Sequence, residues 1–188
     1  MKKKSITQLI PTHNYILMMA ITIICCVSAC KKDGDDHLEK WMIANLNAFN
    51  AIKTNPEYRE LQSPGNEGSI YYKVLQAGDG TDSIRYTSTV TCYYKGYLIA
   101  DYPEENIEKG KVFDQRLFDD GPPRTFAVMN VINGWKTALQ HMVKGDKWEI
   151  WVPYQLGYGS AGSSNSIPGY STLVFEMEIT NVKGVDDL

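Results

Sequence analysis

The chain has 188 residues, of which 43% are hydrophobic and 22% are charged, a composition typical of a globular protein rather than a disordered one. The length accommodates one compact domain with a short additional element and excludes a second catalytic domain. The formal net charge of −3 argues against a nucleic acid as the partner, because nucleic-acid binding depends on an excess of basic residues.

The N-terminus has the layout of a secretory signal peptide. Three lysines at positions 2–4 precede an almost wholly apolar stretch at 16–27, and small residues stand before Cys30. This stretch has about a dozen residues, whereas a membrane-spanning helix needs about 20, so a retained anchor helix is the weaker interpretation. We therefore predict a signal peptide over residues 1–29.

The tetrapeptide Val-Ser-Ala-Cys at 27–30 resembles a bacterial lipobox, in which the cysteine is alkylated with diacylglycerol and becomes the first residue after cleavage. An ordinary cleavage site is the alternative. The resemblance implies that Cys30 carries lipid and that acyl chains attach the protein to the bacterial envelope, with the outer membrane as the expected location. Residues 30–36 would be a flexible polar tether. Their charged run also resembles export tags that send some lipoproteins to the cell surface, so the periplasmic and surface faces both remain open.

The cysteines do not predict a disulfide. Cys25 and Cys26 leave with the signal peptide, and Cys30 is consumed by lipid. Only Cys92 is left, and we expect it to be a small buried hydrophobic residue within a strand.

Apolar residues with helical spacing follow the tether, at Leu38, Trp41, Met42, Leu46, Phe49 and Ile52. Intervals of three and four residues predict one amphipathic helix within an N-terminal helical segment at 37–66. Asp36 and Glu39 form a plausible capping pair, and Pro56 follows where the pattern fades. A lone short helix is marginal in water, so its apolar stripe must be covered by the main domain or by a second copy of the chain in a homodimer.

Strands dominate the remainder of the sequence, in runs rich in valine, threonine and aromatic residues at 69–75, 87–98, 147–152 and 172–182. The last run alternates apolar and polar residues, which predicts one buried and one solvated face. Between the second and third runs, residues 131–143 have helical spacing. These patterns predict an α+β fold in which an antiparallel sheet packs its apolar face on one short helix.

Motifs for metal, nucleotide or nucleophilic chemistry do not appear. The three histidines, His13, His37 and His141, are scattered and stand in no ligand-spaced motif. No nucleophile elbow or glycine-rich phosphate loop is visible. We expect neither a metal nor a cofactor.

Six short motifs occur in a fixed order after residue 67. They are Tyr93-Tyr94-Lys95-Gly96, Lys111-Val112-Phe113-Asp114, Val131-Ile132-Asn133-Gly134-Trp135, Met142-Val143-Lys144-Gly145-Asp146-Lys147, Val152-Pro153 with Leu156-Gly157-Tyr158-Gly159, and Ile167-Pro168 with Thr172-Leu173-Val174-Phe175-Glu176. Their order resembles the FKBP-type peptidyl-prolyl cis-trans isomerases over residues 67–184. The resemblance implies an FKBP-like antiparallel sheet wrapped around one short helix, with the N-terminal helix as an addition.

The resemblance also implies the site and the substrate, which would be prolyl-containing polypeptides. Asp114, Trp135 and Tyr158 would be the catalytic residues, with Trp135 as the pocket floor. The substrate-binding residues would be Tyr94, Phe113, Val131, Ile132, Ile167 and Phe175. Rotation about an X-Pro bond crosses a barrier of about 18–20 kcal/mol, so a catalyst needs only to bind the twisted amide better than the planar one. An aromatic pocket with a few polar groups suffices, which agrees with the missing nucleophile.

Three segments depart from the family pattern. Residues 97–112 form a longer connection than the compact turn of small family members, with a charged middle expected to be an exposed excursion. Arg124 stands beside Pro123, where small members can place another pocket aromatic, so one wall is expected to be polar or open. Residues 160–166 are small and polar, which predicts a mobile rim. A catalytically weak FKBP-like binding or chaperone module on a lipoprotein is therefore the alternative to an isomerase.

Overall fold

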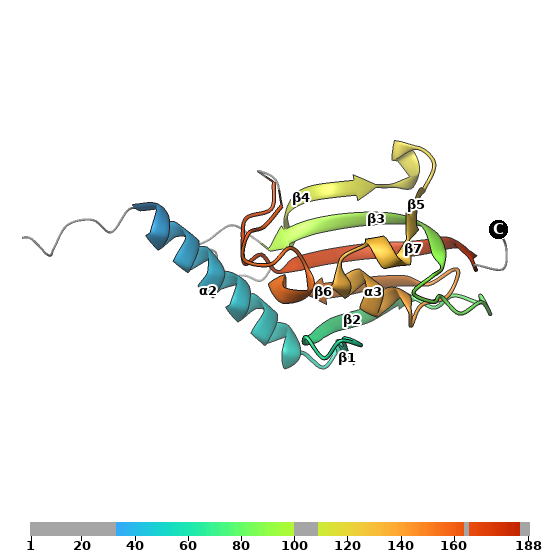
Figure 1. Ribbon diagram of the computed structural model, residues 1–188, viewed down its shortest axis with the longest axis horizontal. Helices are drawn as coiled ribbons and strands as arrows, with labels where there is room; N and C mark the ends of the chain where they lie inside the picture. Colours follow the sequence, from blue (N-terminus) through green and yellow to red (C-terminus); the bar gives the residue numbers. More distant parts are fainter. Residues whose placement is uncertain (1–32, 100–108, 164–165, 185–188) are drawn as a thin grey trace, which may run out of the picture. The chain divides into compact units, whose positions relative to one another are not determined.

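The structure is a computed structural model that describes residues 33–99, 109–163 and 166–184 (Figure 1). Residues His37–Leu188 form one compact unit. The predicted signal peptide and the lipidation site at Cys30 lie outside the described residues.

The described elements comprise two α-helices and one antiparallel sheet (Figure 1). The helices are α2 (Asp33–Lys53) and α3 (Asn133–Leu139), and the strands are β1 (Arg59–Gln62), β2 (Ser69–Gln76), β3 (Thr89–Ile99), β4 (Lys109–Arg116), β5 (Arg124–Ala127), β6 (Lys147–Val152) and β7 (Leu173–Lys183). The strand order is β1-β2-β6-β7-β3-β4, and β5 pairs with the first half of β3 while β4 pairs with its second half. All strand pairs are antiparallel, so the predicted α+β class with an FKBP-like sheet and an extra N-terminal helix is confirmed.

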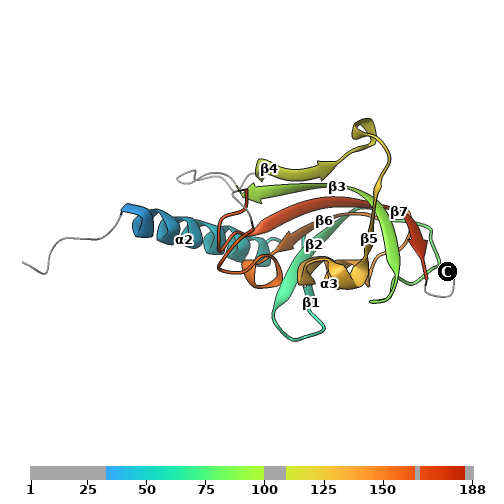
Figure 2. The same ribbon diagram turned by 45° about the horizontal axis from the view of Figure 1, so that its top comes forward.

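One face of the sheet, called the inner face here, packs on α3 (Figure 2). The alternation predicted for β7 is observed, since Leu173, Phe175, Met177 and Ile179 are buried on this face. Helix α3 approaches the sheet closely because it carries glycine at position 134. A Cβ atom there would collide with the side chain of Val152 on β6.

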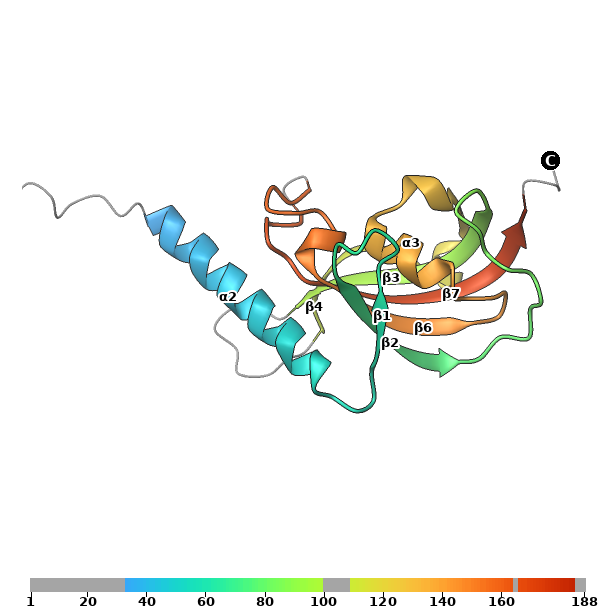
Figure 3. The same ribbon diagram turned by 60° about the horizontal axis from the view of Figure 1, so that its bottom comes forward.

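The opposite, outer face of the sheet is partly covered by α2 (Figure 3). The side chains of Ala48, Phe49 and Ile52 pack on outward-facing residues of four strands, namely Tyr71, Trp151, Val174 and Ile99. The apolar stripe of the helix is thus covered by the chain's own sheet. Apolar side chains on other sides of α2 stay exposed, at Leu38, Ile43 and Leu46.

Several boundaries differ from those predicted. Helix α2 begins at Asp33, so residues 33–36 are helical rather than part of the tether, and Asp36 lies inside the helix rather than at its cap. A run of aspartates suits the first turn of a helix as well as it suits a solvated linker, because the helix dipole favours negative charge at that end. Helix α3 is shorter than 131–143 because turns occupy both flanks.

Three strands were not predicted, namely β1, β4 and β5. Strands β1 and β5 have only four residues each, too few to show a period, and β4 carries charged residues typical of a sheet edge. The supposed excursion at 97–112 is partly strand, since Tyr97 pairs with Val112 and Ile99 with Lys109. Residues 100–108 lie outside the described part. The predicted division into 37–66 and 67–184 stays a prediction.

Candidate functional site

A hollow of about 250 Å³ opens on the inner face of the sheet, beside α3. Its walls come from strands β3, β4, β5 and β7, from α3 and the turn before it, and from the loop after β6. The lining residues are Tyr94, Phe113, Asp114, Phe126, Asn130, Val131, Ile132, Trp135, Tyr158 and Phe175. Eight of the nine predicted catalytic and binding residues therefore lie around one cavity. Ile167, the ninth, is buried in the core and does not line it.

Trp135 lies at the centre of an aromatic cage. Its ring makes edge-to-face contacts with Tyr94 at 5.3 Å, Phe126 at 5.5 Å and Phe175 at 5.2 Å between centroids. Such pairs are more favourable than their buried area alone accounts for, and each ring restricts the next. Trp135 is only 5% exposed, so its ring is largely enclosed by these neighbours and forms the floor of the cavity.

A β-bulge between β3 and β4 places both Phe113 and Asp114 at the cavity. Gly96 pairs with Asp114 and Tyr97 with Val112, so Phe113 is the extra residue on β4. Gly96 is required opposite the bulge, since a Cβ there would lie 2.7 Å from Phe113 Cζ and 2.9 Å from Phe175 Cε1. The Tyr-x-Gly motif thus supplies one wall residue and the space for two others.

A polar cluster borders the cage at the side of β4 and β5. The Tyr94 hydroxyl donates to Asp114 Oδ2 at 2.7 Å, and Arg124 Nη1 donates to the Tyr94 hydroxyl at 2.7 Å. Arg124 Nη1 also lies 3.4 Å from Asp114 Oδ1. Burial, followed by the hydrogen bond to Asp114, raises the pKa of Tyr94 well above that of a free phenol, against the opposing effect of Arg124. The phenol therefore stays protonated as a donor at neutral pH.

The wall expected to be polar or open carries Arg124 at its edge and also an aromatic that the sequence patterns did not indicate, Phe126. Arg124 and Phe126 are two residues apart on β5, and both contact Tyr94. Phe126 closes the cage while Arg124 lies at its edge. The alternation along a strand could have indicated Phe126, but a four-residue strand is too short to recognise from sequence. Asn130, also missed, carries no sequence signal of its own.

Tyr158 comes from the rim, the loop that follows β6. Its side chain is 39% exposed, and its pKa is raised by burial and by the negative charge of Asp114. Backbone hydrogen bonds close this loop, from Gly159 N–H to the Tyr154 carbonyl and from Tyr170 N–H to the Gly159 carbonyl. Rim mobility stays a prediction.

The start of α3 supplies backbone polar groups beside the cage. Ile132 is the N-cap residue, and its carbonyl accepts the first helical hydrogen bond, from Lys136 N–H at 3.0 Å. The first N–H groups of a helix have no partner within it. This end of α3 is therefore a suitable place to bind a carbonyl oxygen.

The side chains of the cavity do not resemble a metal centre. Among residues 33–99, 109–163 and 166–184, no group of three histidine, cysteine or acidic side chains could hold an ion. The arrangement suits binding of an apolar ring, with polar groups on two sides.

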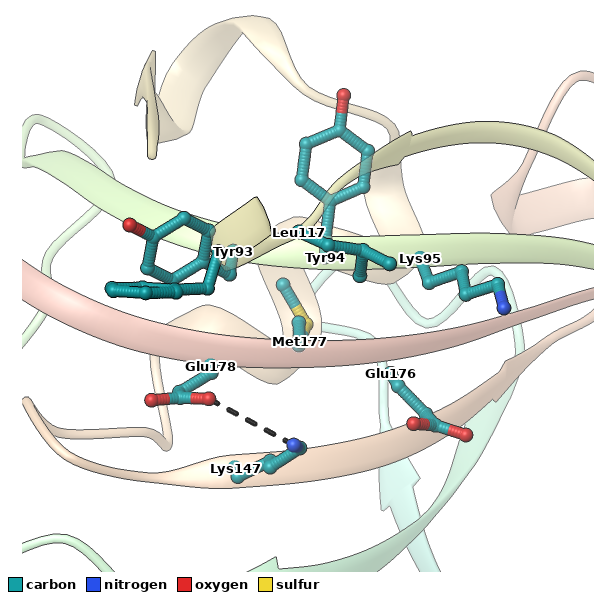
Figure 4. Close-up of a pocket in the computed structure, with 9 residues that line it drawn as sticks. Tyr93, Tyr94, Lys95, Leu117, Lys147, Glu176, Met177 and Glu178 are labelled. Carbon is teal, nitrogen blue, oxygen red and sulfur yellow. Dashed lines mark ion pairs between the residues drawn. The ribbon is translucent and has the colours of Figure 1, made fainter. Parts of the chain in front are cut away.

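A second hollow, of about 340 Å³, lies on the outer face of the sheet (Figure 4). Lys147 of β6 and Glu178 of β7 turn toward each other there, 3.8 Å apart. Lys95 and Glu176 add further charge, and the aromatic Phe118 at its border is 79% exposed. Although this hollow is larger, four charged side chains line it, whereas Asp114 is the one charged residue among the described residues lining the inner cavity, so the inner cavity is the candidate site for an apolar ring.

Comparisons with known proteins place the similarity on the same region. The family model described as FKBP-type peptidyl-prolyl cis-trans isomerase matches residues 80–180. The chain is 39% identical over 116 residues to the FKBP-type 22 kDa peptidyl-prolyl cis-trans isomerase of Escherichia coli, covering 62% of this chain and 51% of that protein. It is 36% identical over 114 residues to the outer membrane protein MIP of Legionella longbeachae, covering 61% of this chain and 44% of that protein. The chain thus spans about half the length of these relatives.

A solved structure of an isomerase shares this fold. The crystal structure of a peptidyl-prolyl cis-trans isomerase from Pseudomonas syringae superposes with a TM-score of 0.63 and 31% sequence identity, covering 78% of this chain and 96% of that one. Within the described residues, no helix is both long and apolar enough to cross a membrane.

Proposed function

Because the chain belongs to the FKBP-type peptidyl-prolyl cis-trans isomerase family, we propose that it catalyses cis-trans isomerisation of X-Pro bonds in polypeptides. The aromatic cage around Trp135 is the observation that carries the proposal. A pocket lined mainly by aromatic and aliphatic side chains suits the proline ring, and its described lining residues include no serine, cysteine, histidine or lysine that could act as a nucleophile.

The cavity would accelerate rotation by differential binding. Twisting the amide breaks its resonance, and the barrier of about 18–20 kcal/mol falls if the twisted form is bound more tightly than the planar one. The cage holds the ring, and the backbone N–H of Ile132 would donate to a substrate carbonyl. Asp114 and the Tyr158 hydroxyl would contact the twisting amide. No proton transfer or covalent intermediate is needed.

The proposed setting is the bacterial envelope, where the protein would assist the folding of exported proteins. Two observations support it: the signal-like N-terminus with its lipobox-like 27–30, and the relative named outer membrane protein MIP. Lipid on Cys30 would attach the protein to the outer membrane, on its periplasmic or surface face.

A proline-limited refolding assay on the compact unit from His37 onward tests the activity. The unit should accelerate refolding, and Trp135→Ala should abolish most of the acceleration because it removes the cage floor. Phe118→Ala is the matched control, since it deletes an exposed aromatic outside the cavity. Circular dichroism of both variants checks that they fold.

No acceleration by the unmodified unit would sink the proposal. Equal acceleration by Trp135→Ala would also do so, because catalysis would then not depend on the cage.

A non-catalytic binding or chaperone module is the second candidate. It is favoured by Arg124, which engages Tyr94 and Asp114 and so occupies polar groups that a substrate would use. Suppression of aggregation of a proline-free unfolded protein, retained in Trp135→Ala but lost when 100–108 is deleted, would support this candidate over the isomerase.

Homodimerisation through α2 is compatible with either function. The stripe of Phe49 and Ile52 is covered by the sheet, so a dimer would have to use the exposed Leu38, Ile43 and Leu46. Analytical ultracentrifugation of the unit and of Ile43→Glu should then give two different masses. A monomeric mass for both removes the dimer.

A further inference from the structure

Helix α2 is joined to the chain just before β7 by three buried hydrogen bonds. Trp41 Nε1 donates to Ser171 Oγ at 3.3 Å. Thr172 N–H donates to Asn45 Oδ1 at 2.6 Å, and Thr172 Oγ1 donates to the Asn45 carbonyl at 3.1 Å. The side chains involved are 1–6% exposed, so water does not compete for these bonds.

Asn45 is an unexpected residue at this place in α2. It lies between Trp41 and Phe49 at intervals of four, within the stripe that packs on the sheet. Burying an amide is costly unless it is hydrogen-bonded, and an apolar residue would pack there at no such cost. The Asn45 amide is bonded on both sides, because Nδ2 donates to the Trp41 carbonyl at 2.8 Å while Oδ1 accepts from Thr172. The amide therefore serves a specific contact with the segment before β7.

That segment is part of the rim of the candidate site. Tyr170, next to Ser171, has a φ of 63°, in the left-handed region that non-glycine residues seldom adopt. Its N–H donates to the Gly159 carbonyl at 3.0 Å, and its ring lies 5.1 Å from that of Tyr154. A strained residue of this kind persists only where its surroundings hold it.

A short path of contacts thus leads from α2 to the cavity. Asn45 is hydrogen-bonded to Thr172, two residues beyond Tyr170, and Tyr170 is hydrogen-bonded to Gly159. Gly159 directly follows Tyr158, which lines the cavity. The beginning and the end of the rim loop also lie close together, since a Cβ on Gly169 would collide with the Ser160 carbonyl.

We propose that Asn45, assisted by Trp41, is a positioning residue for the isomerase site: it holds the rim in the conformation that places Tyr158 at the cavity. This inference rests on the proposed function, because it assigns a role in substrate binding to a helix outside the pocket. Asn45 touches no substrate and acts only through the rim.

A merely structural role for Asn45 would give a different result from a positioning role. Loss of general stability would loosen the whole sheet equally and leave the KM of the folded fraction unchanged. Loss of positioning would loosen the rim selectively and raise KM, because the substrate would then have to order the loop on binding.

The test compares Asn45→Ala with Asn47→Ala in the full chain, purified in detergent and assayed on a prolyl tetrapeptide. Asn47 is the matched control, since it is exposed on the same helix. We expect Asn45→Ala to raise KM by about three- to tenfold with little change in kcat, the range that ordering one or two side chains implies. Hydrogen exchange should become faster at the amides of Tyr170 and Thr172 and stay unchanged in β3 and β7. Asn47→Ala should match the unmodified chain in both readouts.

A second pair of variants covers the case in which Asn45→Ala does not fold. Thr172→Val keeps the side-chain shape but deletes the hydroxyl bonded to α2, whereas Thr172→Ser restores it. Raised KM in the valine variant and recovery in the serine variant support the inference. The inference is overturned if KM is unchanged in both Asn45→Ala and Thr172→Val, or if hydrogen exchange becomes faster equally across the whole sheet. An inactive unmodified chain would instead refute the proposed isomerase activity, and the exchange readout would still report whether Asn45 holds the rim.

Discussion

The two faces of the sheet carry helices of very different kinds. The inner face holds α3, which has seven residues and contributes Trp135 to an aromatic cage. The outer face holds α2, which has 21 residues, beside a hollow lined by lysine and glutamate. Residues that alternate along one strand serve both faces: on β7, Phe175 lies in the cage while Glu176 borders the charged hollow.

The inner face carries the candidate site, and the outer face carries a helix that supports it. The cage presents mainly aromatic and aliphatic side chains, which suit a proline ring, whereas four charged side chains line the outer hollow. Helix α2 buries apolar area on the far face, while its Trp41 joins the main core cluster and, with Asn45, is hydrogen-bonded to the rim. Substitutions on the two faces should therefore have different effects on stability and on activity.

The largest expected effect on stability lies on the outer face. Phe49 is 6% exposed and contacts the ring of Tyr71 edge to face at 5.6 Å. Phe49→Ala should lower the free energy of unfolding by about 3–5 kcal/mol, as for other buried phenylalanines, in urea denaturation followed by circular dichroism. Ile43→Ala, at an exposed position of the same helix, should change it by less than about 0.5 kcal/mol. Equal small effects would mean that α2 is not docked.

Gly96→Ala tests the close packing of the inner face. The new methyl group would press on Phe113 and Phe175, which should cost about 1–3 kcal/mol of stability. Displaced cage rings should lower kcat/KM by as much as about a hundredfold. Unchanged isomerase kinetics would show that the cage does not bind the substrate.

The dryness of the inner face can be measured through Cys92. Burial raises the pKa of this thiol from 9.0 to about 12. Above pH 9 the unfolded chain therefore loses the proton while the folded chain keeps it, so the contribution of Cys92 to stability is present below pH 9 and is lost as pH rises toward 12. From pH 7 to pH 10 the loss should reach about 1.4 kcal/mol. Cys92→Ala should show a smaller fall in unfolding free energy from pH 7 to pH 10 than the unmodified chain, and equal falls would contradict a dry inner face.

Tyr94→Phe should have a smaller effect. It removes the hydroxyl that links Asp114 and Arg124 but keeps the ring in the cage. Loss of these two partly exposed hydrogen bonds should cost about 1–2 kcal/mol of stability. Arg124 would be free to pair with Asp114 alone, so kcat/KM should fall severalfold and not to zero. Complete loss of isomerase activity would indicate that the Tyr94 hydroxyl acts directly in catalysis.

The smallest effect is expected in the charged hollow. Lys147 and Glu178 are each about 40% exposed in their side chains and 3.8 Å apart. Exposed ion pairs contribute about 0–1 kcal/mol, so Lys147→Ala should leave both stability and kcat/KM nearly unchanged. A clear loss of activity in this variant would indicate that the active site lies on the outer face.

The features of this molecule that can be predicted from the sequence are those that show a pattern among neighbouring residues. The alternation along β7 identifies its buried face, and the Val-Ile-x-Gly-Trp motif identifies Trp135 by its residues alone. Phe126 is missed because β5 has only four residues. The apolar stripe of α2 predicts that some surface covers it, but it does not distinguish the chain's own sheet from a second copy of the chain. The contact made by Asn45 has no local signature, because its hydrogen bond with Thr172 depends on a residue 127 positions away.

The most direct test of the proposed site is a titration of the compact unit with a prolyl tetrapeptide, followed by NMR of the four tryptophan indole N–H resonances. If the peptide binds in the cage on the inner face, Trp135 should shift most and Trp151, which lies under α2, should stay unchanged. An unshifted Trp135, together with shifts at Trp151 or in the backbone of Tyr93 and Phe118, would place the peptide on the outer face and contradict the proposed site.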